Sequence, residues 1–398
     1  MTPLKHQVTD HGGGVWSIPV PIPDNPLGHT LVHLLDTDRG PVLIDTGWDD
    51  PASWDTLVAG LAACGVAVGE IHGVLITHHH PDHHGLSGRV REASGAWLAM
   101  HAADTNVVLR SRESRPGVWL DYLIGKLTLA GAPEDHLAPL RTARDEGRMR
   151  TLPHLRAALP DREIVPGELL DLAGRRLRAI WTPGHTPGHV CLHLEERHPG
   201  LSHEPGAGGP RASGAAVIGA AHHTGGAHHA GGAHTHGHAG GAHGAIGHTP
   251  AGHGRLFSGD HLLPGITPHI GLYEDPDDLT VTDPLGDYLD SLERIGRLGP
   301  AEVLPAHQYA FTDAAGRVRE LLEHHAARLA DLRELLAVRP LTLWRLAESM
   351  EWNRPWAQIP YGSRNIALSE AEAHVRRLVK LGLAEPTQDS DPVTYQAV

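Results

Sequence analysis

Histidine and aspartate side chains gather in one short stretch of the sequence. His78, His80, Asp82 and His83 fall within six residues. Imidazole and carboxylate groups are ligands that Zn²⁺ accepts at about 2.0–2.2 Å. Alternate positions 78 and 80 can converge from an extended segment, while Pro81 turns the chain and presents Asp82 and His83 elsewhere. Two such clusters on one turn indicate two metal ions rather than one.

Three further residues of the same chemistry lie far along the sequence, each after a segment that predicts a β-strand. They are His185 in Thr-Pro-Gly-His-Thr-Pro-Gly, Asp260 in Phe-Ser-Gly-Asp and His307 in Leu-Pro-Ala-His. A single histidine after a strand is usually an ordinary polar loop residue, so each carries weight only as part of the ordered series. We interpret His79 and His84, which lie outside the alternation in the first loop, as bystanders.

The segments that must position these residues predict a mixed α/β protein. Strand-like runs, bounded by Pro, Gly and Asp turns, lie at 15–20, 30–35, 41–45, 71–76, 168–182, 190–194, 255–258 and 302–305. Helical patterns, with apolar residues three or four positions apart, lie at 51–64, 102–158, 284–298 and 313–337. The run at 71–76 leads directly into the first cluster, so we expect a buried strand to carry it.

The last 60 residues form a separate pattern of helix, helix and short strand. Helices are predicted at 341–350 and 369–381, and a strand at 393–398. This order is typical of a winged-helix-like module. We therefore predict one domain over residues 1–312 and a second, made of a helical linker and this module, over 313–398.

Composition and charge restrict the function further. The 398 residues are 40% apolar, which excludes wholesale disorder, and carry a net charge of −14. A protein that binds polyanions over its whole surface has the opposite balance. Cys64 and Cys191 cannot form a disulfide framework. With neither a signal-like start nor an apolar run of about 18 residues, we expect a cytoplasmic protein without a membrane span.

Residues 198–254 differ from the rest of the chain. They hold twelve of the 34 histidines, only two charged residues and no aromatic residue. Such a stretch cannot offset its ordering entropy by burial, so we predict a disordered insertion. A zinc reservoir built from these histidines remains an alternative.

Together these motifs resemble the metallo-β-lactamase-fold hydrolases, specifically the branch with glyoxalase II-like thioesterases. The first metal motif of that family, His-x-His-x-Asp-His, is matched in full by residues 78–83, and His185, Asp260 and His307 follow in the family's order. Asp45, in Ile-Asp-Thr-Gly, resembles the early aspartate that supports the metal loop. The resemblance covers about residues 15–310, apart from the insertion at 198–254, and implies an αββα sandwich. Because 101 residues separate His83 from His185, we expect the helical stretch 102–158 to be an insert that lies over the cleft as a cap.

Position by position, the resemblance implies two Zn²⁺ ions per chain, although such mixed sites also accept Fe or Mn. The implied donors are His78, His80 and His185 for one ion, Asp82, His83 and His307 for the other, and Asp260 as a bridge. A bridging hydroxide would attack an electrophilic carbonyl or phosphorus. Asp82 is also expected to orient this nucleophile as the catalytic residue, and Asp45 to fix a ligand imidazole from outside the ligand set.

Three functions follow from this interpretation. We favour hydrolysis of a thioester or other ester-like small substrate, and not of antibiotics, because the best-known zinc β-lactamases lack the histidine that stands here at 83. Related lactamase-β-like proteins with a winged helix include endoribonucleases, so an endoribonuclease or phosphodiesterase is the alternative. The eleven basic and eleven acidic residues from 317 onward favour packing or homodimerisation over nucleic-acid binding. A metal-binding protein that uses the His-rich loop is the third hypothesis.

The helical insert supplies the residues expected to contact substrate. They are Arg110, Arg112, Trp119 and Tyr122.

Overall fold

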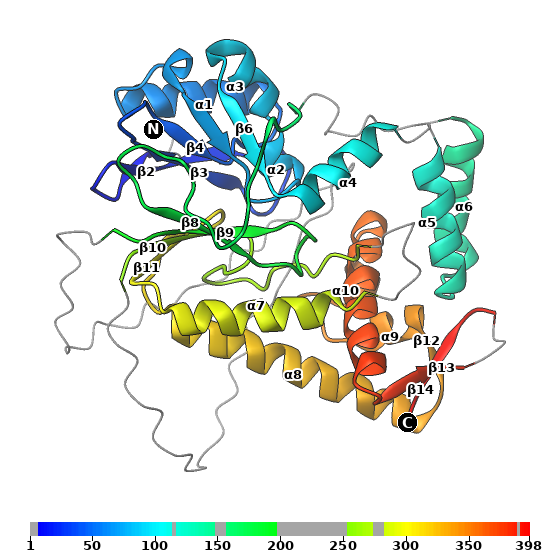
Figure 1. The fold of residues 1–398 in the computed structure, drawn as a ribbon. Helices are drawn as coiled ribbons and strands as arrows, with labels where there is room; N and C mark the ends of the chain where they lie inside the picture. Colours follow the sequence, from blue (N-terminus) through cyan, green and yellow to red (C-terminus); the bar gives the residue numbers. More distant parts are fainter. Residues whose placement is uncertain (1–6, 114–116, 148–156, 197–252, 274–281, 388–390) are drawn as a thin grey trace, which may run out of the picture.

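The computed structural model describes residues 7–113, 117–147, 157–196, 253–273, 282–387 and 391–398. Two β-sheets lie face to face, with helices on the outer side of each (Figure 1). This arrangement confirms the predicted αββα sandwich. The predicted insertion at 198–254 lies outside the described residues except for its last two positions.

The first sheet has seven strands in sequence order. They are β1 (Thr9–Asp10), β2 (Val15–Pro21), β3 (His29–Leu35), β4 (Val42–Ile44), β5 (Gly73–Leu75), β6 (Trp97–Met100) and β7 (Arg162–Glu163). Pairing is antiparallel from β1 to β4 and parallel from β4 to β7. Its outer face is covered by α1 (Pro51–Ala63) and α3 (Ser87–Ser94), with the 3₁₀ turn Val68–Glu70 between them in the chain. The prediction of a helix at 51–64 is therefore confirmed.

The second sheet has four strands in the order β11-β10-β9-β8. They are β8 (Leu177–Trp181), β9 (Val190–Leu194), β10 (Arg255–Gly259) and β11 (Glu302–Pro305). Only β10 and β11 run parallel. Helices α7 (Pro284–Leu298) and α8 (Ala314–Val338) cover its outer face (Figure 1). The strand predicted at 168–182 is shorter than expected and occupies only the end of that run.

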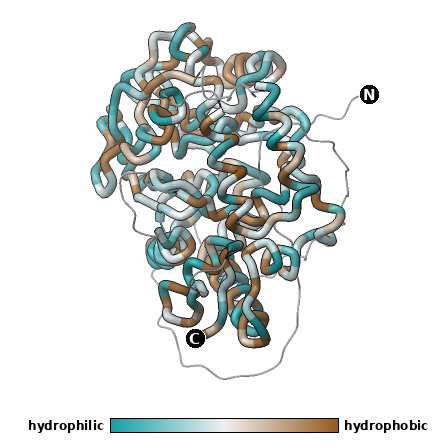
Figure 2. The backbone as a smooth tube through the Cα atoms, turned by 90° about the vertical axis from the view of Figure 1, so that its right-hand side faces the viewer, coloured by the Kyte–Doolittle hydropathy of each residue, from teal (hydrophilic) through white to brown (hydrophobic). Residues whose placement is uncertain are grey.

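Alternation along the strands sorts side chains between separate cores, because successive residues of a strand point to opposite faces. On β4, Val42 and Ile44 join the core between the sheets, while Leu43 faces α1 and α3. On β9, Leu192 faces the first sheet and Cys191 packs toward α7 and α8. Hydrophobic stretches accordingly alternate with hydrophilic ones along the elements (Figure 2).

The C-terminal module contains two helices and a small antiparallel sheet in the order β12-β14-β13. Its elements are β12 (Leu341–Thr342), α9 (Leu343–Ser349), the 3₁₀ turn Trp356–Gln358, α10 (Tyr361–Lys380), β13 (Ala384–Pro386) and β14 (Thr394–Ala397). The helix predicted at 341–350 begins two residues late, because Thr342 is its N-cap and accepts a hydrogen bond from Arg345 N. The winged-helix assignment and the boundary after residue 312 stay predictions.

The helical stretch predicted at 102–158 forms α4 (Ala102–Glu113), α5 (Val118–Leu129) and α6 (Glu134–Asp145), followed by residues that lead into β7. Leu127 of α5 and Leu137 of α6 belong to the hydrophobic core of the C-terminal module, with Trp344 and Leu378. Backbone bonds reinforce this contact, since Trp344 N donates to the Ala130 carbonyl. These two helices therefore lie beside α9 and α10 (Figure 1), and α4 is the part of the insert nearest the two sheets.

Among the described helices, every one falls short of the length and apolar character that a bilayer crossing requires. The predicted cytoplasmic location stays a prediction.

Candidate metal centre

All the residues singled out by the sequence motifs lie at one edge of the sandwich. Most of them follow a strand directly. Asp45 follows β4, His78 and His80 follow β5, His185 follows β8, Asp260 follows β10 and His307 follows β11. Asp82 and His83 lie on α2 (Pro81–His84), a single turn that opens with Pro81. The side chains are almost completely buried, except for His80, which is half-buried. Strand ends of two different sheets thus meet at one point.

Three imidazole nitrogens form a first group. His78 Nε2 lies 3.0 Å from His80 Nδ1 and 3.2 Å from His185 Nε2, and the latter two atoms are 3.0 Å apart. Ligand atoms at about 2.1 Å from a tetrahedral ion are about 3.4 Å apart. The three nitrogens therefore converge on a point at nearly the spacing that a metal ion requires.

A second group lies beside the first. Asp82 Oδ2 is 3.6 Å from His83 Nε2 and 3.4 Å from His307 Nε2. Asp260 lies between the two groups: its Oδ1 is 3.4 Å from His83 Nε2 and 3.2 Å from His307 Nε2, while its Oδ2 is 3.6 Å from His185 Nε2. One carboxylate thus presents one oxygen to each group, which is the geometry of a bridging ligand.

Outer hydrogen bonds fix the imidazole tautomers. The Nδ1–H of His83 donates to Asp45 Oδ2 at 2.8 Å, that of His185 to the His269 carbonyl at 2.7 Å, and that of His307 to the His29 carbonyl at 3.0 Å. Because these acceptors require the proton on Nδ1, each neutral ring turns a lone pair on Nε2 toward the centre.

Asp45 also organises the first metal loop. Its carboxylate accepts from the backbone N of Thr77 at 2.8 Å and from Thr77 Oγ1 at 2.9 and 3.1 Å. Asp45 has φ of 64°, in the left-handed region that aspartate tolerates better than most residues. The residue predicted to act from outside the ligand set therefore contacts both His83 and the segment that leads to His78.

The electrostatics of the second group show strong competition between burial and charge. Burial lowers the pKa of His307, but the Asp260 and Asp82 carboxylates outweigh this and raise that pKa to about 10. Burial also lowers the pKa of His83, and Asp82, Asp260 and Asp45 raise it well above the usual value. Without a metal, these rings hold protons, which a divalent ion must displace.

The buried donors fit metal ions better than they fit each other. Among the described residues, His83 Nε2, His307 Nε2 and Asp260 Oδ1 are buried, and the two nitrogens lie 3.4 and 3.2 Å from that oxygen as ion-pair contacts, but none of the three atoms makes a hydrogen bond of regular geometry. Buried polar atoms without regular hydrogen bonds are costly, so a native structure needs a reason to keep them together. Nitrogen and carboxylate donors in two adjoining groups, His78–His80–His185 and Asp82–His83–His307, suit two borderline divalent ions.

A cavity of about 310 Å³ opens beside the first group. His80 and His185 line it together with Val107 and Arg110 of α4 and with Leu272. Of the four residues expected to contact substrate, Arg110 is the one that lines this cavity. Arg112 instead donates to the Ala157 carbonyl, and Trp119 is exposed on α5.

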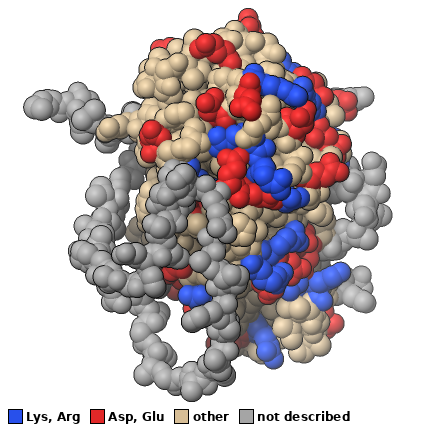
Figure 3. All heavy atoms as spheres, turned by 60° about the vertical axis from the view of Figure 1, so that its left-hand side comes forward, with Lys and Arg blue, Asp and Glu red and all other residues tan. Residues whose placement is uncertain are grey.

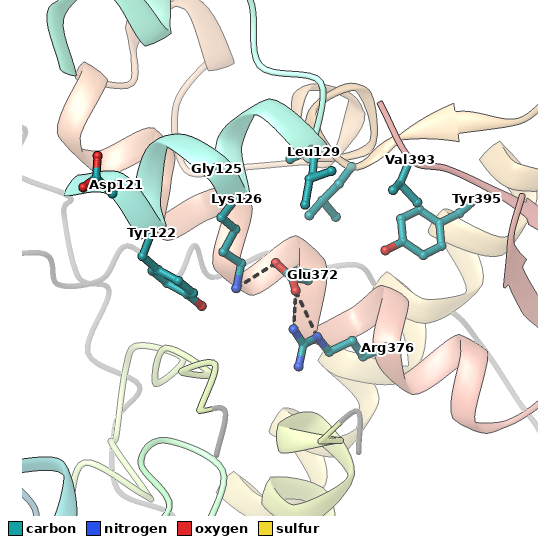
Figure 4. A pocket seen from close by; sticks show the side chains of 11 residues that line it. Asp121, Tyr122, Gly125, Lys126, Leu129, Glu372, Arg376, Val393 and Tyr395 are labelled. Atoms are coloured by element: carbon teal, nitrogen blue, oxygen red, sulfur yellow. Dashed lines mark hydrogen bonds and ion pairs between the residues drawn. The ribbon is translucent and has the colours of Figure 1, made fainter. Parts of the chain in front are cut away.

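A second cavity of about 480 Å³ lies between α5 and α10. Tyr122 lines it, and Glu372 lies between Lys126 and Arg376, with which it forms ion pairs (Figure 4). It is the larger cavity, but none of the His and Asp donors lines it. Of these two cavities, the smaller one is therefore the one beside the candidate metal donors.

Two histidines that neighbour the motif residues contact the site from outside the two donor groups. His79, interpreted above as a bystander, donates its backbone N–H to Asp104 Oδ2 at 2.8 Å, and its Nδ1 lies 3.1 Å from the same oxygen. His189 Nε2 accepts from Asp260 N at 3.1 Å. Asp104 was not predicted, because an aspartate in the first turn of a helix is ordinary; its only signal is a position just after a strand end. The remaining bystander, His84, contacts the Ala158 carbonyl.

Two stacked sheets, outer helices and adjoining His/Asp groups at the strand ends define a protein of the metallo-β-lactamase fold. A crystal structure of a metallo-beta-lactamase family protein from Thermus thermophilus is similar with a TM-score of 0.66 and 26% identity, over 97% of this chain and 99% of that one. The family model described as "Metallo-beta-lactamase superfamily" matches residues 25–198. Residues 25–198 thus match this superfamily, and the fold of the chain is that of the superfamily, as the motifs predicted.

Curated relatives carry hydrolase names. A hydroxyacylglutathione hydrolase of Acidiphilium cryptum is 32% identical over 143 residues, which are 35% of this chain and 37% of that protein. A probable metallo-hydrolase of Bacillus subtilis, YqjP, is 22% identical over 336 residues and 84% of each chain. The first match thus spans little more than a third of its relative. These names support the prediction of a metal-dependent hydrolase.

Proposed function

We propose that this protein is a hydrolase that uses two zinc ions to cleave a thioester or another ester-like bond in a small substrate. The observation that carries the proposal is the pair of adjoining donor groups joined by the Asp260 carboxylate. The assigned donors are His78, His80 and His185 for the first ion, Asp82, His83 and His307 for the second, and Asp260 for both.

When bound, the two ions supply Lewis-acid polarisation of the substrate oxygen and a nucleophilic water at neutral pH. The residues of the chain supply position and proton control. Asp82, on the single turn α2, is proposed to accept a hydrogen bond from that water and orient it toward the substrate. Asp45 holds the His83 ring so that Nε2 keeps its lone pair for the centre.

The cavity beside the first group supports a small acyl substrate. Val107, Pro187 and Leu272 make part of its wall apolar, beside polar residues such as Arg110 and Ser111. Its volume of about 310 Å³ lies at the lower end of small-molecule sites. The Acidiphilium relative is named a hydroxyacylglutathione hydrolase, and an acylglutathione is a thioester, which supports a thioester as the bond cleaved.

The endoribonuclease alternative has less support. On the face of the molecule seen in Figure 3, acidic and basic side chains lie side by side instead of forming one basic surface. A protein that holds an RNA strand uses a basic groove to neutralise its phosphates. The third hypothesis, metal binding by the His-rich loop, concerns residues outside the described part of the chain.

The test compares three substrates with zinc-loaded protein: an S-D-lactoylglutathione-type thioester, bis-p-nitrophenyl phosphate and single-stranded RNA. We expect turnover of the thioester, and a fall in kcat of about 10²–10⁴ in Asp82→Ala. Asp161→Asn is the control, because Asp161 accepts from Leu98 N and pairs with Arg91 away from the metal centre. Faster turnover of the phosphodiester or the RNA would replace the thioester proposal, and full activity in Asp82→Ala would remove Asp82 from it.

A further inference from the structure

Asp104 is a buried carboxylate at the first turn of α4. Its Oδ2 accepts from the backbone N of His79 at 2.8 Å and from Thr186 Oγ1 at 2.8 Å, and lies 3.1 Å from His79 Nδ1. Its Oδ1 accepts from the backbone N of Gly188 at 2.6 Å. One side chain thus receives hydrogen bonds from two loops that are far apart in the sequence.

Both loops carry donors of the first metal group. His79 lies between His78 and His80, and Thr186 is the residue after His185. The three imidazole nitrogens of this group are 3.0–3.2 Å apart, and they come from these two loops alone. The distance between the His78–His80 loop and the His185 loop therefore determines whether the three imidazole nitrogens can bind one ion.

The local environment is built for a carboxylate in this position. Burial raises the pKa of Asp104, but His79 and the hydrogen bonds from His79 and Thr186 outweigh it, so the pKa lies below its usual value. A Cβ on Gly188 would lie 2.5 Å from Asp104 N and 2.7 Å from Oδ1. The second loop can approach α4 this closely because residue 188 has no side chain.

We propose that Asp104 is a positioning residue for the first metal group, which it assembles by tying the His78–His80 loop to the His185 loop. The inference rests on the proposed metal site. Asp104 itself contacts neither the ion nor the substrate; it acts through the backbone of His79 and Gly188 and the hydroxyl of Thr186.

An asparagine at 104 cannot reproduce these contacts. Each oxygen of the Asp104 carboxylate accepts a backbone N–H, that of His79 on Oδ2 and that of Gly188 on Oδ1, and a backbone N–H can only donate. The amide NH₂ of Asn would therefore face at least one donor and push one loop away. Thr186→Val is milder, because it removes one hydrogen bond and keeps the shape of the side chain.

Metal affinity measured one group at a time tests the proposal. In a His307→Ala background, which disables the second group, Zn²⁺ competition with a chromophoric chelator reports the first group. In a His80→Ala background the same titration reports the second. We expect Asp104→Asn to weaken the first group about 10- to 100-fold, the range found for the outer partners of metal ligands. The Zn²⁺ affinity of the second group should change by less than about threefold, because Asp45 holds His83 and the His29 carbonyl holds His307, and neither contact involves Asp104.

Matched variants separate positioning from folding. Thr186→Val should weaken the first group by less than Asp104→Asn, in the same direction, and Asp161→Asn should change neither group. If Asp104→Asn does not fold, Thr186→Val decides, and wild-type affinity at the first group in that variant overturns the proposal. Equal weakening of both groups by Asp104→Asn also overturns it. Failure of the wild-type chain to bind two ions would instead refute the proposed function.

Discussion

Replacing Asp45 with asparagine tests whether the outer carboxylate sets the tautomer of His83. Asp45 Oδ1 accepts the backbone N–H of Thr77 at 2.8 Å, and Oδ2 accepts the Nδ1–H of His83, also at 2.8 Å. An Asn side chain must keep its carbonyl toward the fixed backbone N–H, which turns its NH₂ toward His83. The ring then accepts at Nδ1 and carries its proton on Nε2, the atom that faces Asp82 and Asp260.

The expected effect is a loss of affinity at the second metal group. Losing the outer partner of a metal-ligating histidine costs about 10- to 100-fold, or about 1.4–2.7 kcal/mol. We expect the upper end, because the reversed tautomer removes the lone pair as well as the orientation. At free zinc about 100 times the wild-type Kd, binding stabilises the fold by about 2.7 kcal/mol; a Kd weaker by about 100-fold leaves about 0.4 kcal/mol.

The assay is Zn²⁺ competition with a chelator in the His80→Ala background, together with urea unfolding at fixed free zinc. Asp45→Ala serves as the comparison, since it leaves the Thr77 N–H buried without its acceptor and lowers the stability of the metal-free protein by about 1–3 kcal/mol. Wild-type Zn²⁺ affinity at the second group in Asp45→Asn, with the same zinc-dependent stabilisation, would refute the tautomer argument.

Two other predictions follow from described contacts. Burial lowers the pKa of His374, beside His325, Glu370 and Arg328, to about 4. As the pH is lowered from about 6.5 to about 4, the unfolded chain takes up a proton at His374 that the folded chain does not, so the free energy of unfolding decreases by up to about 3 kcal/mol. Urea unfolding of His374→Gln should therefore show a smaller decrease over this pH range. An unchanged decrease contradicts the assignment to His374. Replacing residues 197–252 with a short turn should leave two zinc ions per chain, as measured by elemental analysis. A short turn can close this gap, because Leu194 and Arg255 are paired neighbours on β9 and β10. Loss of most of the metal would favour the hypothesis that the His-rich loop binds it.

Much of the fold could be predicted from local patterns. The period of two in segments such as Val42–Ile44 sorts side chains to the two faces of a strand, and Asp50 and Pro51 mark the start of α1 as capping rules predict. Boundaries were predicted less well where neighbours decide them. Helix α10 begins at Tyr361, eight residues before the predicted start at 369, and its first turns are held by contacts such as that of Asn365 with His136 of α6.

The sequence by itself predicted which residues would carry the proposed chemistry, because a metal motif depends on residue types at short spacings, as in His78 to His83, and on strand ends that precede His185, Asp260 and His307. The resemblance implied how these residues divide into two groups, but only the tertiary structure gave the distances at which they meet, with one Asp260 oxygen toward each group. Only the tertiary structure showed that Asp104 bonds both loops of the first group. It also decided that α5 and α6 pack on the C-terminal module. The physical reason is that an apolar helix face or a buried carboxylate requires a partner, but its local sequence does not specify which distant segment provides one.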